Sequence, residues 1–278
     1  MHIAPHDNQN QAIVDVGDSK VPLVYFNIVK LNKGDAFEYQ VPGYETCIVP
    51  ATGTVDVDVE GVVFTALGGR GVDVWDGDPQ GAYVPTGIKA TMVCTSDKAE
   101  VFIAGAKYEK VLEPFDVREF DLVQYGSDDT KTHRKIKHIL GQKQHDKVGR
   151  LLVSELYTVG AGGWSGFPSH KHDTERLPDE TRHDECYNFR FKPDYGSGLQ
   201  MLQRVDNEPG DAYHIVNGST VLIDKGYHPC CALPGYEMYY FTILGGLTQR
   251  SLVQYFQPTH SAQLETIPGI KDMIAKFK

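Results

Sequence analysis

Short runs of apolar and β-branched residues, separated by glycine, proline or aspartate, fill most of this 278-residue chain. Residues 20–107 contain VPLVYFNIV, ETCIVPATG, TVDVDVEG, GAYVPTG and ATMVCTS, and a second series begins at residue 150 with RLLVSELYTVG. In TVDVDVEG every valine falls on one face of an extended chain, which is typical of a half-buried strand. Two series of short strands with tight turns predict an all-β fold of tandem sandwiches or small barrels.

The change in pattern between the two series predicts the domain organisation. We expect an N-terminal domain over residues 1–112 and a C-terminal domain over residues 148–278. Residues 113–147 are highly charged and show little alternation, so we expect a connector between the two domains. In the tail GIKDMIAKFK the apolar residues stand at helical spacing, which predicts a short amphipathic helix with no chemical role. These residues are Ile270, Met273, Ile274 and Phe277.

Composition excludes several classes of protein. No segment approaches the roughly 18 consecutive apolar residues of a membrane span, and MHIAPHDNQN lacks the pattern of a secretory signal. The net charge of −10 opposes binding to nucleic acid. Five cysteines without a CxxC pair argue against a disulfide framework or a zinc-thiolate site, so a cytoplasmic location is expected.

His170 and His172 are separated by one lysine in the sequence SHKHD. Alternate side chains of a strand share a face, so the two imidazoles could hold one metal ion. Glu185 could complete the site from a strand on which it shares a face with Tyr187 and Phe189, and His228 follows a glycine turn in GYHP. Glu175 and Glu180 are nearer alternatives to Glu185. A further alternative is that His170 and His172 are two exposed histidines that bind no metal.

The order of these residues resembles the two metal motifs of the cupin superfamily, although twelve residues separate His172 from Glu185 where the usual cupin has three or four. No histidine occurs between His6 and His133. If the two halves share a fold, the strands of the first half between these positions have no imidazole to offer a metal. The stretches GGWSGFPSHKHD, DECYNFRF, VLIDKGYHPCCALPGYEMYYFTILGG and LGGRGVDVWDGDPQGAYVPTG resemble the 5-deoxy-glucuronate isomerase family of bacterial myo-inositol catabolism. This resemblance spans nearly the whole chain.

The resemblance implies a bicupin of two tandem β-barrel or jelly-roll domains, with a degenerate first domain. It also implies a divalent metal (zinc, manganese, iron or nickel) bound by His170, His172, Glu185 and His228. The implied reaction converts 5-deoxy-glucuronate into 2-deoxy-5-keto-gluconate, so the implied partner is a small sugar acid. The alternatives are a cupin dioxygenase that uses the same ligands and a bicupin that binds a sugar acid without turnover.

Such an isomerisation needs a base, for which Tyr240 and a metal-bound water are candidates. Tyr240 could equally be packing in the barrel. The substrate carboxylate needs a cationic partner, and Gln203 could bind a sugar hydroxyl unless its role is structural. The cationic candidates are Lys171, Arg190 and Arg204, although Arg190 lies on the strand face opposite Glu185 and could be a surface charge. A homo-oligomer could form through an edge strand or the C-terminal helix.

Overall fold

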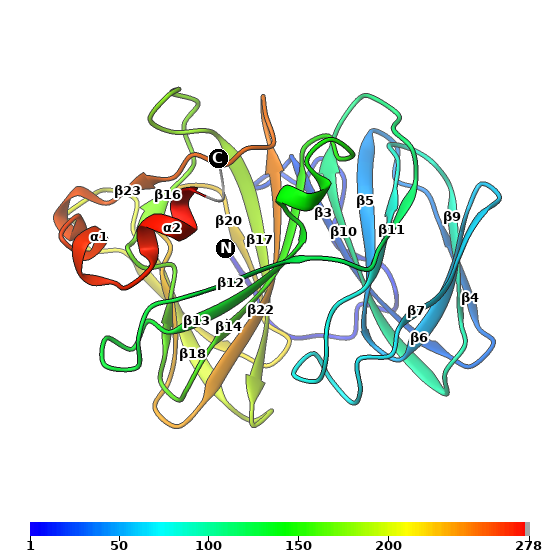
Figure 1. Cartoon of the computed structure of the whole chain (residues 1–278), viewed down its shortest axis with the longest axis horizontal. Helices are drawn as coiled ribbons and strands as arrows, with labels where there is room; N and C mark the ends of the chain where they lie inside the picture. Colours follow the sequence, from blue (N-terminus) through cyan, green and yellow to red (C-terminus); the bar gives the residue numbers. More distant parts are fainter. Residues whose placement is uncertain (276–278) are drawn as a thin grey trace.

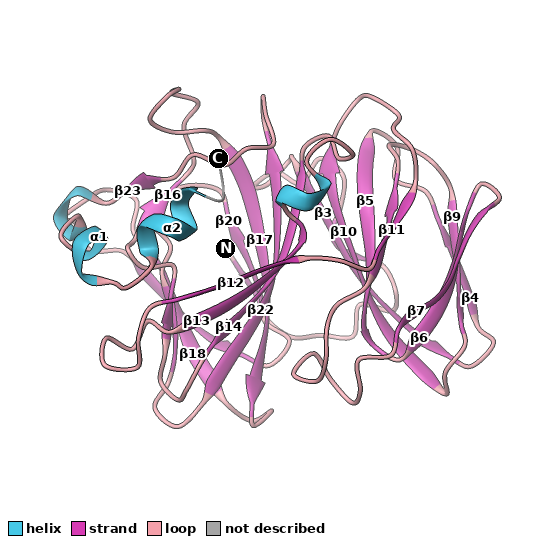
Figure 2. Cartoon of the chain, viewed as in Figure 1, coloured by secondary structure: helices cyan, strands magenta, loops and turns pink. Residues whose placement is uncertain are grey.

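A computed structural model of the chain describes residues 1–275, and strands make up most of it (Figures 1 and 2). The helical segments are short: η1 (Gln142–Gln144), η2 (Pro258–His260), α1 (Gln263–Thr266) and α2 (Ile270–Ala275). The predicted all-β class is therefore confirmed. Among the described residues, no helix has the length and apolar character that a bilayer crossing requires.

The N-terminal half, at the right of Figure 1, is built from two facing sheets. The six-stranded sheet has the order β11-β8-β5-β10-β3-β2, with strands β2 (Ala12–Val14), β3 (Val24–Asn32), β5 (Tyr44–Thr52), β8 (Gly81–Val84), β10 (Lys98–Lys107) and β11 (Phe115–Val117). The four-stranded sheet has the order β4-β9-β6-β7, with strands β4 (Ala36–Tyr39), β6 (Thr54–Val59), β7 (Val62–Gly68) and β9 (Ala90–Cys94). The alternation predicted for TVDVDVEG is confirmed, because Val55, Val57 and Val59 are buried in the core between these sheets.

The C-terminal half repeats this plan with a larger sheet. The seven-stranded sheet has the order β1-β20-β17-β22-β14-β13-β12, with strands β1 (His2–Ile3), β12 (Asp121–Tyr125), β13 (Arg134–Leu140), β14 (Leu151–Thr158), β17 (His183–Lys192), β20 (Thr220–Ile223) and β22 (Glu237–Gly246). The opposite sheet has the order β15-β21-β18-β19, with strands β15 (Trp164–Ser165), β18 (Ser197–Leu202), β19 (Asp211–Val216) and β21 (Cys230–Ala232). A separate pair joins β16 (His170–Lys171) to β23 (Tyr255–Phe256).

The segment 113–147, predicted as a connector, does cross from one half to the other, but it contains three strands. Strand β11 extends the six-stranded sheet, whereas β12 and β13 form one edge of the seven-stranded sheet. The first strand, β1, also belongs to the C-terminal half, where it pairs with β20. Each half therefore depends on residues from outside the range that the sequence assigns to it.

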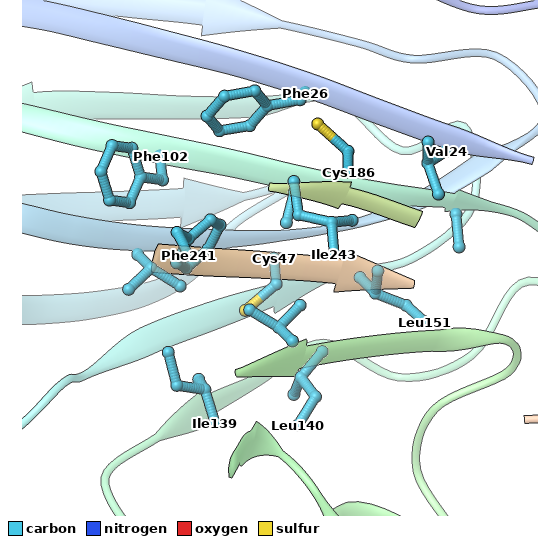
Figure 3. Close-up of a cluster of buried hydrophobic side chains, with 14 of the residues drawn as sticks. Val24, Phe26, Cys47, Phe102, Ile139, Leu140, Leu151, Cys186, Phe241 and Ile243 are labelled. Carbon is cyan, nitrogen blue, oxygen red and sulfur yellow. The ribbon is translucent and has the colours of Figure 1, made fainter. Parts of the chain in front are cut away.

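The two large sheets pack face to face and share one hydrophobic core (Figure 3). Phe26 and Phe102 come from the N-terminal half and contact Phe241 of β22, with 4.6 Å between the ring centroids of Phe102 and Phe241. All three side chains are fully buried, and burying one phenylalanine contributes about 1.5–3 kcal/mol. The halves therefore stabilise each other.

Buried polar contacts fix the register between the halves. The Glu45 carboxylate in β5 accepts hydrogen bonds from the backbone N–H groups of residues 149, 150 and 151. The Arg70 guanidinium lies 2.6 Å from the Glu155 carboxylate in β14, and both side chains are inaccessible to solvent. Removing either partner of such a pair would leave an uncompensated buried charge, so the two halves are held in this arrangement.

The C-terminal helix predicted from its apolar spacing is confirmed as α2, drawn in red in Figure 1. Ile270 and Met273 are buried against Val123, Tyr125 and Ile136 of strands β12 and β13. The predicted contribution of Phe277 lies outside the described residues. The helix closes one side of the interior of the C-terminal half.

Candidate metal centre

Three histidines from separate segments meet inside the C-terminal half. His170 lies in β16, His172 follows that strand directly, and His228 lies in the turn between β20 and β21. One ring nitrogen from each can be chosen so that all three lie within 4.8 Å of one another. The prediction that His170 and His172 point the same way agrees with this arrangement.

Backbone carbonyls orient all three imidazoles. Nδ1 of His170 lies 3.1 Å from the Pro168 oxygen, Nδ1 of His172 lies 3.0 Å from the His183 oxygen, and Nδ1 of His228 lies 2.8 Å from the Gly226 oxygen. A carbonyl only accepts hydrogen bonds, so each Nδ1 carries the hydrogen. In the neutral ring Nε2 then holds the lone pair that a metal needs, which is the usual support for a metal-binding histidine.

Glu185 of β17 lies beside two of these nitrogens. One carboxylate oxygen is 3.1 Å from Nε2 of His172 and 3.2 Å from Nε2 of His228. Burial alone would raise the pKa of Glu185, but the adjacent imidazoles of His172 and His228 hold that pKa far below its ordinary value. The group is therefore an ionised carboxylate, which is the form that binds a metal.

The four side chains fit a divalent cation. Nε2 of His228 is buried and has no hydrogen-bond partner among the described residues. Burial and the neighbouring imidazoles of His228 and His172 lower the pKa of His170, which keeps that ring neutral. A neutral Nε2 and a carboxylate oxygen both offer lone pairs, so a cation between them satisfies groups that otherwise repel.

A glycine turn places His228. Gly226 has φ of +96°, and a Cβ there would lie 2.6 Å from the Gln203 carbonyl oxygen. The Gly226 N–H donates to the Asp173 carboxylate at 2.8 Å, which ties this turn to the segment that follows His172. Only glycine satisfies both the left-handed conformation and the close approach.

The loop between His172 and Glu185 explains the long spacing of the motif. Glu180 is buried, and its carboxylate accepts hydrogen bonds from the N–H groups of Asp173 and Thr174. Lys171 points away from the histidines and pairs with Asp173 at 2.6 Å and with Glu180 at 3.2 Å. Glu175 is exposed, and its carboxylate accepts hydrogen bonds from the Arg182 N–H and the Thr248 hydroxyl. The structure therefore brings Glu185, and neither nearer glutamate, to the histidines.

Arg190 lies on the opposite face of β17 from Glu185, as strand parity predicts, but it is not a free surface charge. Its guanidinium contacts the carboxylates of Asp73 and Glu100 in the N-terminal half. Arg190 thus joins the two halves and does not meet the histidines.

Gln203 and Arg204 also lie away from the histidines. The Gln203 amide donates to the Glu208 carbonyl and accepts from Gln257. Arg204 is exposed and pairs with Asp224 at 2.8 Å. Both residues hold surface loops together in this structure.

Tyr240 does line the same cavity as His170, His172 and Glu185. Its hydroxyl lies 2.5 Å from Oγ of Ser165, and its ring centroid is 4.6 Å from that of Tyr187. Burial raises the pKa of Tyr240 well above its ordinary value, so the side chain is a neutral phenol. It can donate a proton or a hydrogen bond, but it is a poor base.

Sequence reasoning missed several polar residues of this cavity, among them Gln254 and Arg134. The Gln254 side-chain amide lies 3.0 Å from Nε2 of His170, and it donates to that nitrogen because Nδ1 carries the hydrogen. Arg134 of β13 is buried, and its guanidinium lies 4.3 Å from the centroid of the Tyr125 ring. The shared parity of Arg134, Ile136 and His138 in RKIKHIL places them on one strand face, but it does not mark Arg134 as a site residue.

These features define a class of protein. Two facing pairs of sheets, with histidines and a glutamate gathered inside the second pair, form a cupin-like fold with a candidate metal centre.

Comparison with known sequences identifies the family. Residues 2–263 match the KduI/IolB family, and the chain belongs to that family. A 5-deoxy-glucuronate isomerase of Geobacillus thermodenitrificans is 29% identical over 245 residues, which cover 87% of each chain. One of Bacillus subtilis strain 168 is 27% identical over 252 residues, or 91% of this chain and 92% of that protein. The chain is therefore an isomerase, and the resemblance drawn from its motifs is confirmed.

Solved structures agree with this assignment. An IolB-like protein of Salmonella typhimurium LT2 superposes with a TM-score of 0.85 at 25% identity, covering 94% of this chain and 98% of the other. An oxalate decarboxylase of Bacillus subtilis superposes with a TM-score of 0.58 at 8% identity, covering 92% and 79%. The second likeness concerns the fold alone.

Proposed function

We propose that this protein is a metal-dependent aldose–ketose isomerase that converts 5-deoxy-glucuronate into 2-deoxy-5-keto-gluconate in myo-inositol catabolism. The observation that carries the proposal is the gathering of His170, His172 and His228, whose Nδ1 atoms are held by backbone carbonyls, with Glu185 beside Nε2 of His172 and of His228. The names of the curated relatives supply the substrate.

The reaction moves one proton from the carbon beside the aldehyde to the aldehyde carbon, and the hydroxyl proton of that neighbouring carbon to the aldehyde oxygen, with no net oxidation. Negative charge develops on the two adjacent oxygens during this transfer. A divalent ion held by His170, His172, Glu185 and His228 would supply positive charge to stabilise those oxygens. Zinc, manganese, iron and nickel all suit this set of ligands.

The side chains around these ligands have their own roles in the proposal. Tyr240 donates a hydrogen bond toward a substrate oxygen, because its hydroxyl is protonated and is held by Ser165. Its ring and that of Tyr187 exclude water from one wall of the cavity. Met273 of α2 and Phe256 of β23 line the same cavity with apolar surface.

The finer architecture is also proposed. The two halves are related cupin domains, of which only the C-terminal one keeps metal ligands. The repeated plan of facing sheets supports this interpretation, as does the absence of histidine between His6 and His133. The expected setting is the cytoplasm, where the sugar acid is a metabolic intermediate.

Two variants test the metal site. His172→Ala removes one ligand, whereas His214→Ala removes an exposed histidine of β19 as a matched control. We expect His172→Ala to lose bound metal by elemental analysis and at least about 100-fold of the isomerase rate. His214→Ala should retain both. Equal metal content and equal rates in the two variants would refute the assigned ligands.

A further inference from the structure

Arg134 is a buried cation without a buried anion. Its side chain lies inside the C-terminal half, and no carboxylate of residues 1–275 forms an ion pair with it. Arginine does not lose its proton in proteins, so the charge persists. Burial of an unpaired charge is costly, and arginine is well shaped to receive a carboxylate.

The protein contacts of Arg134 leave part of the guanidinium unsatisfied. One terminal nitrogen donates to Oγ of Ser165 at 3.3 Å, and the other donates to the Phe167 carbonyl. Nε is buried and has no partner in the described residues. Arg250 offers a contrast, because its guanidinium donates to three backbone carbonyls.

Arg134 and the candidate metal centre are held in place by the same short backbone segment. The carbonyl of Phe167 accepts from Arg134, and the carbonyl of the next residue, Pro168, accepts from His170. Ser165 accepts from Arg134 and also contacts the Tyr240 hydroxyl. Arg134 lines the same cavity as His170, His172 and Glu185. One short segment, residues 165–168, therefore positions both the guanidinium and a metal ligand.

We propose that Arg134 binds the carboxylate of the sugar acid and so selects acids over neutral aldoses. This inference rests on the proposed function. The cations expected from sequence for this role, Lys171, Arg190 and Arg204, each have carboxylate partners already. Both ends of the substrate are thus bound by the protein, with the aldehyde at the histidines and the carboxylate at Arg134.

The first test compares two substrates in three proteins. The substrates are 5-deoxy-glucuronate and the corresponding neutral aldose, in which CH2OH replaces the carboxylate. The proteins are wild type, Arg134→Met and Arg118→Met, where Arg118 is an exposed arginine of the N-terminal half. Arg134→Lys is added because it keeps the charge if the methionine variant folds poorly.

We expect wild type to prefer the acid by about 100-fold in kcat/KM, as a charge-assisted contact allows. Arg134→Met should lose most of that preference by slowing the acid alone, with metal content unchanged. Arg134→Lys should keep part of the preference, and Arg118→Met should keep all of it. Equal losses for acid and neutral aldose, or no preference in wild type, would overturn the inference.

The second test does not depend on turnover. D-Glucuronate should raise the melting temperature of wild type and of Arg118→Met, whereas D-glucose at the same concentration should not. Arg134→Met should show no shift with either sugar. If wild type converts neither aldose yet shows this pattern, the proposed reaction fails and the carboxylate site stands. The absence of a shift in wild type overturns the carboxylate site.

Discussion

Gly226 controls the direction of His228. Its positive φ and the nearby Gln203 carbonyl leave no room for a side chain. We expect Gly226→Ala to displace the turn, lower metal affinity by at least about tenfold, and cost roughly 2 kcal/mol or more of stability.

Gly235→Ala is the matched control, because Gly235 has φ of +92° but nothing within 4 Å of the added Cβ. That variant should lose only about 1 kcal/mol and keep its metal. Metal titration together with thermal unfolding distinguishes the two variants. Identical metal affinities in Gly226→Ala and Gly235→Ala would contradict the role given to this turn.

Glu185 supplies the negative charge of the proposed site. Glu185→Gln keeps the size of the side chain and removes that charge, so we expect loss of bound metal and a fall of at least about 100-fold in isomerase rate. Glu175→Gln, at an exposed position in the preceding loop, should match wild type. Elemental analysis checks both variants, and metal loss in Glu175→Gln instead would assign the ligand to the loop.

Of the candidate site residues, the histidines were the easiest to predict from the sequence. The parity of His170 and His172 and the turn before His228 are local features, and Glu185 was preferred because it opens a predicted strand. Arg134 could not be found in this way. Its importance arises from the segment 165–168, which meets β13 only in the folded chain.

Two elements of the C-terminal half, β13 and α2, form walls of the cavity that sequence analysis did not assign to it. Sequence analysis did not predict β13 as a strand, because both of its faces carry polar groups. Arg134 and His138 line the cavity, whereas Lys137 is buried on the other face and pairs with Asp78 of the N-terminal half. The usual alternation of apolar and polar residues is therefore absent from this strand.

Helix α2 covers the cavity with Ile270 and Met273. The double change Ile270→Ala and Met273→Ala removes this apolar cover, so we expect water to enter and the isomerase rate to fall at least about tenfold. Lys271→Ala, on the exposed side of the same helix, is the control and should keep the wild-type rate. Equal rates in all three proteins would show that the helix has no part in the reaction.

The two halves form one structural unit, because their large sheets share a core and Glu45 and Arg70 reach across it. We expect a single cooperative unfolding transition for the whole chain. Phe241→Ala should lower stability by about 3–5 kcal/mol, which corresponds to roughly 10 °C in the melting temperature.

Phe37→Ala, at a partly exposed position of the four-stranded sheet in the N-terminal half, should have a smaller effect. Differential scanning calorimetry of the three proteins tests this account. Two separate transitions, with only one moved by Phe241→Ala, would mean that the halves unfold independently. The sequence suggested two domains, but the packing between them depends on contacts that no local pattern reports.

We propose that a metal held by three histidines and a glutamate drives the isomerisation of a sugar acid. The most direct measurement is proton NMR of 5-deoxy-glucuronate with the chelator-treated protein under nitrogen, before and after a divalent metal is restored. We predict no conversion without metal and formation of 2-deoxy-5-keto-gluconate once metal is added. An aldehyde signal that persists after metal addition, or that disappears equally well without metal, would contradict the account.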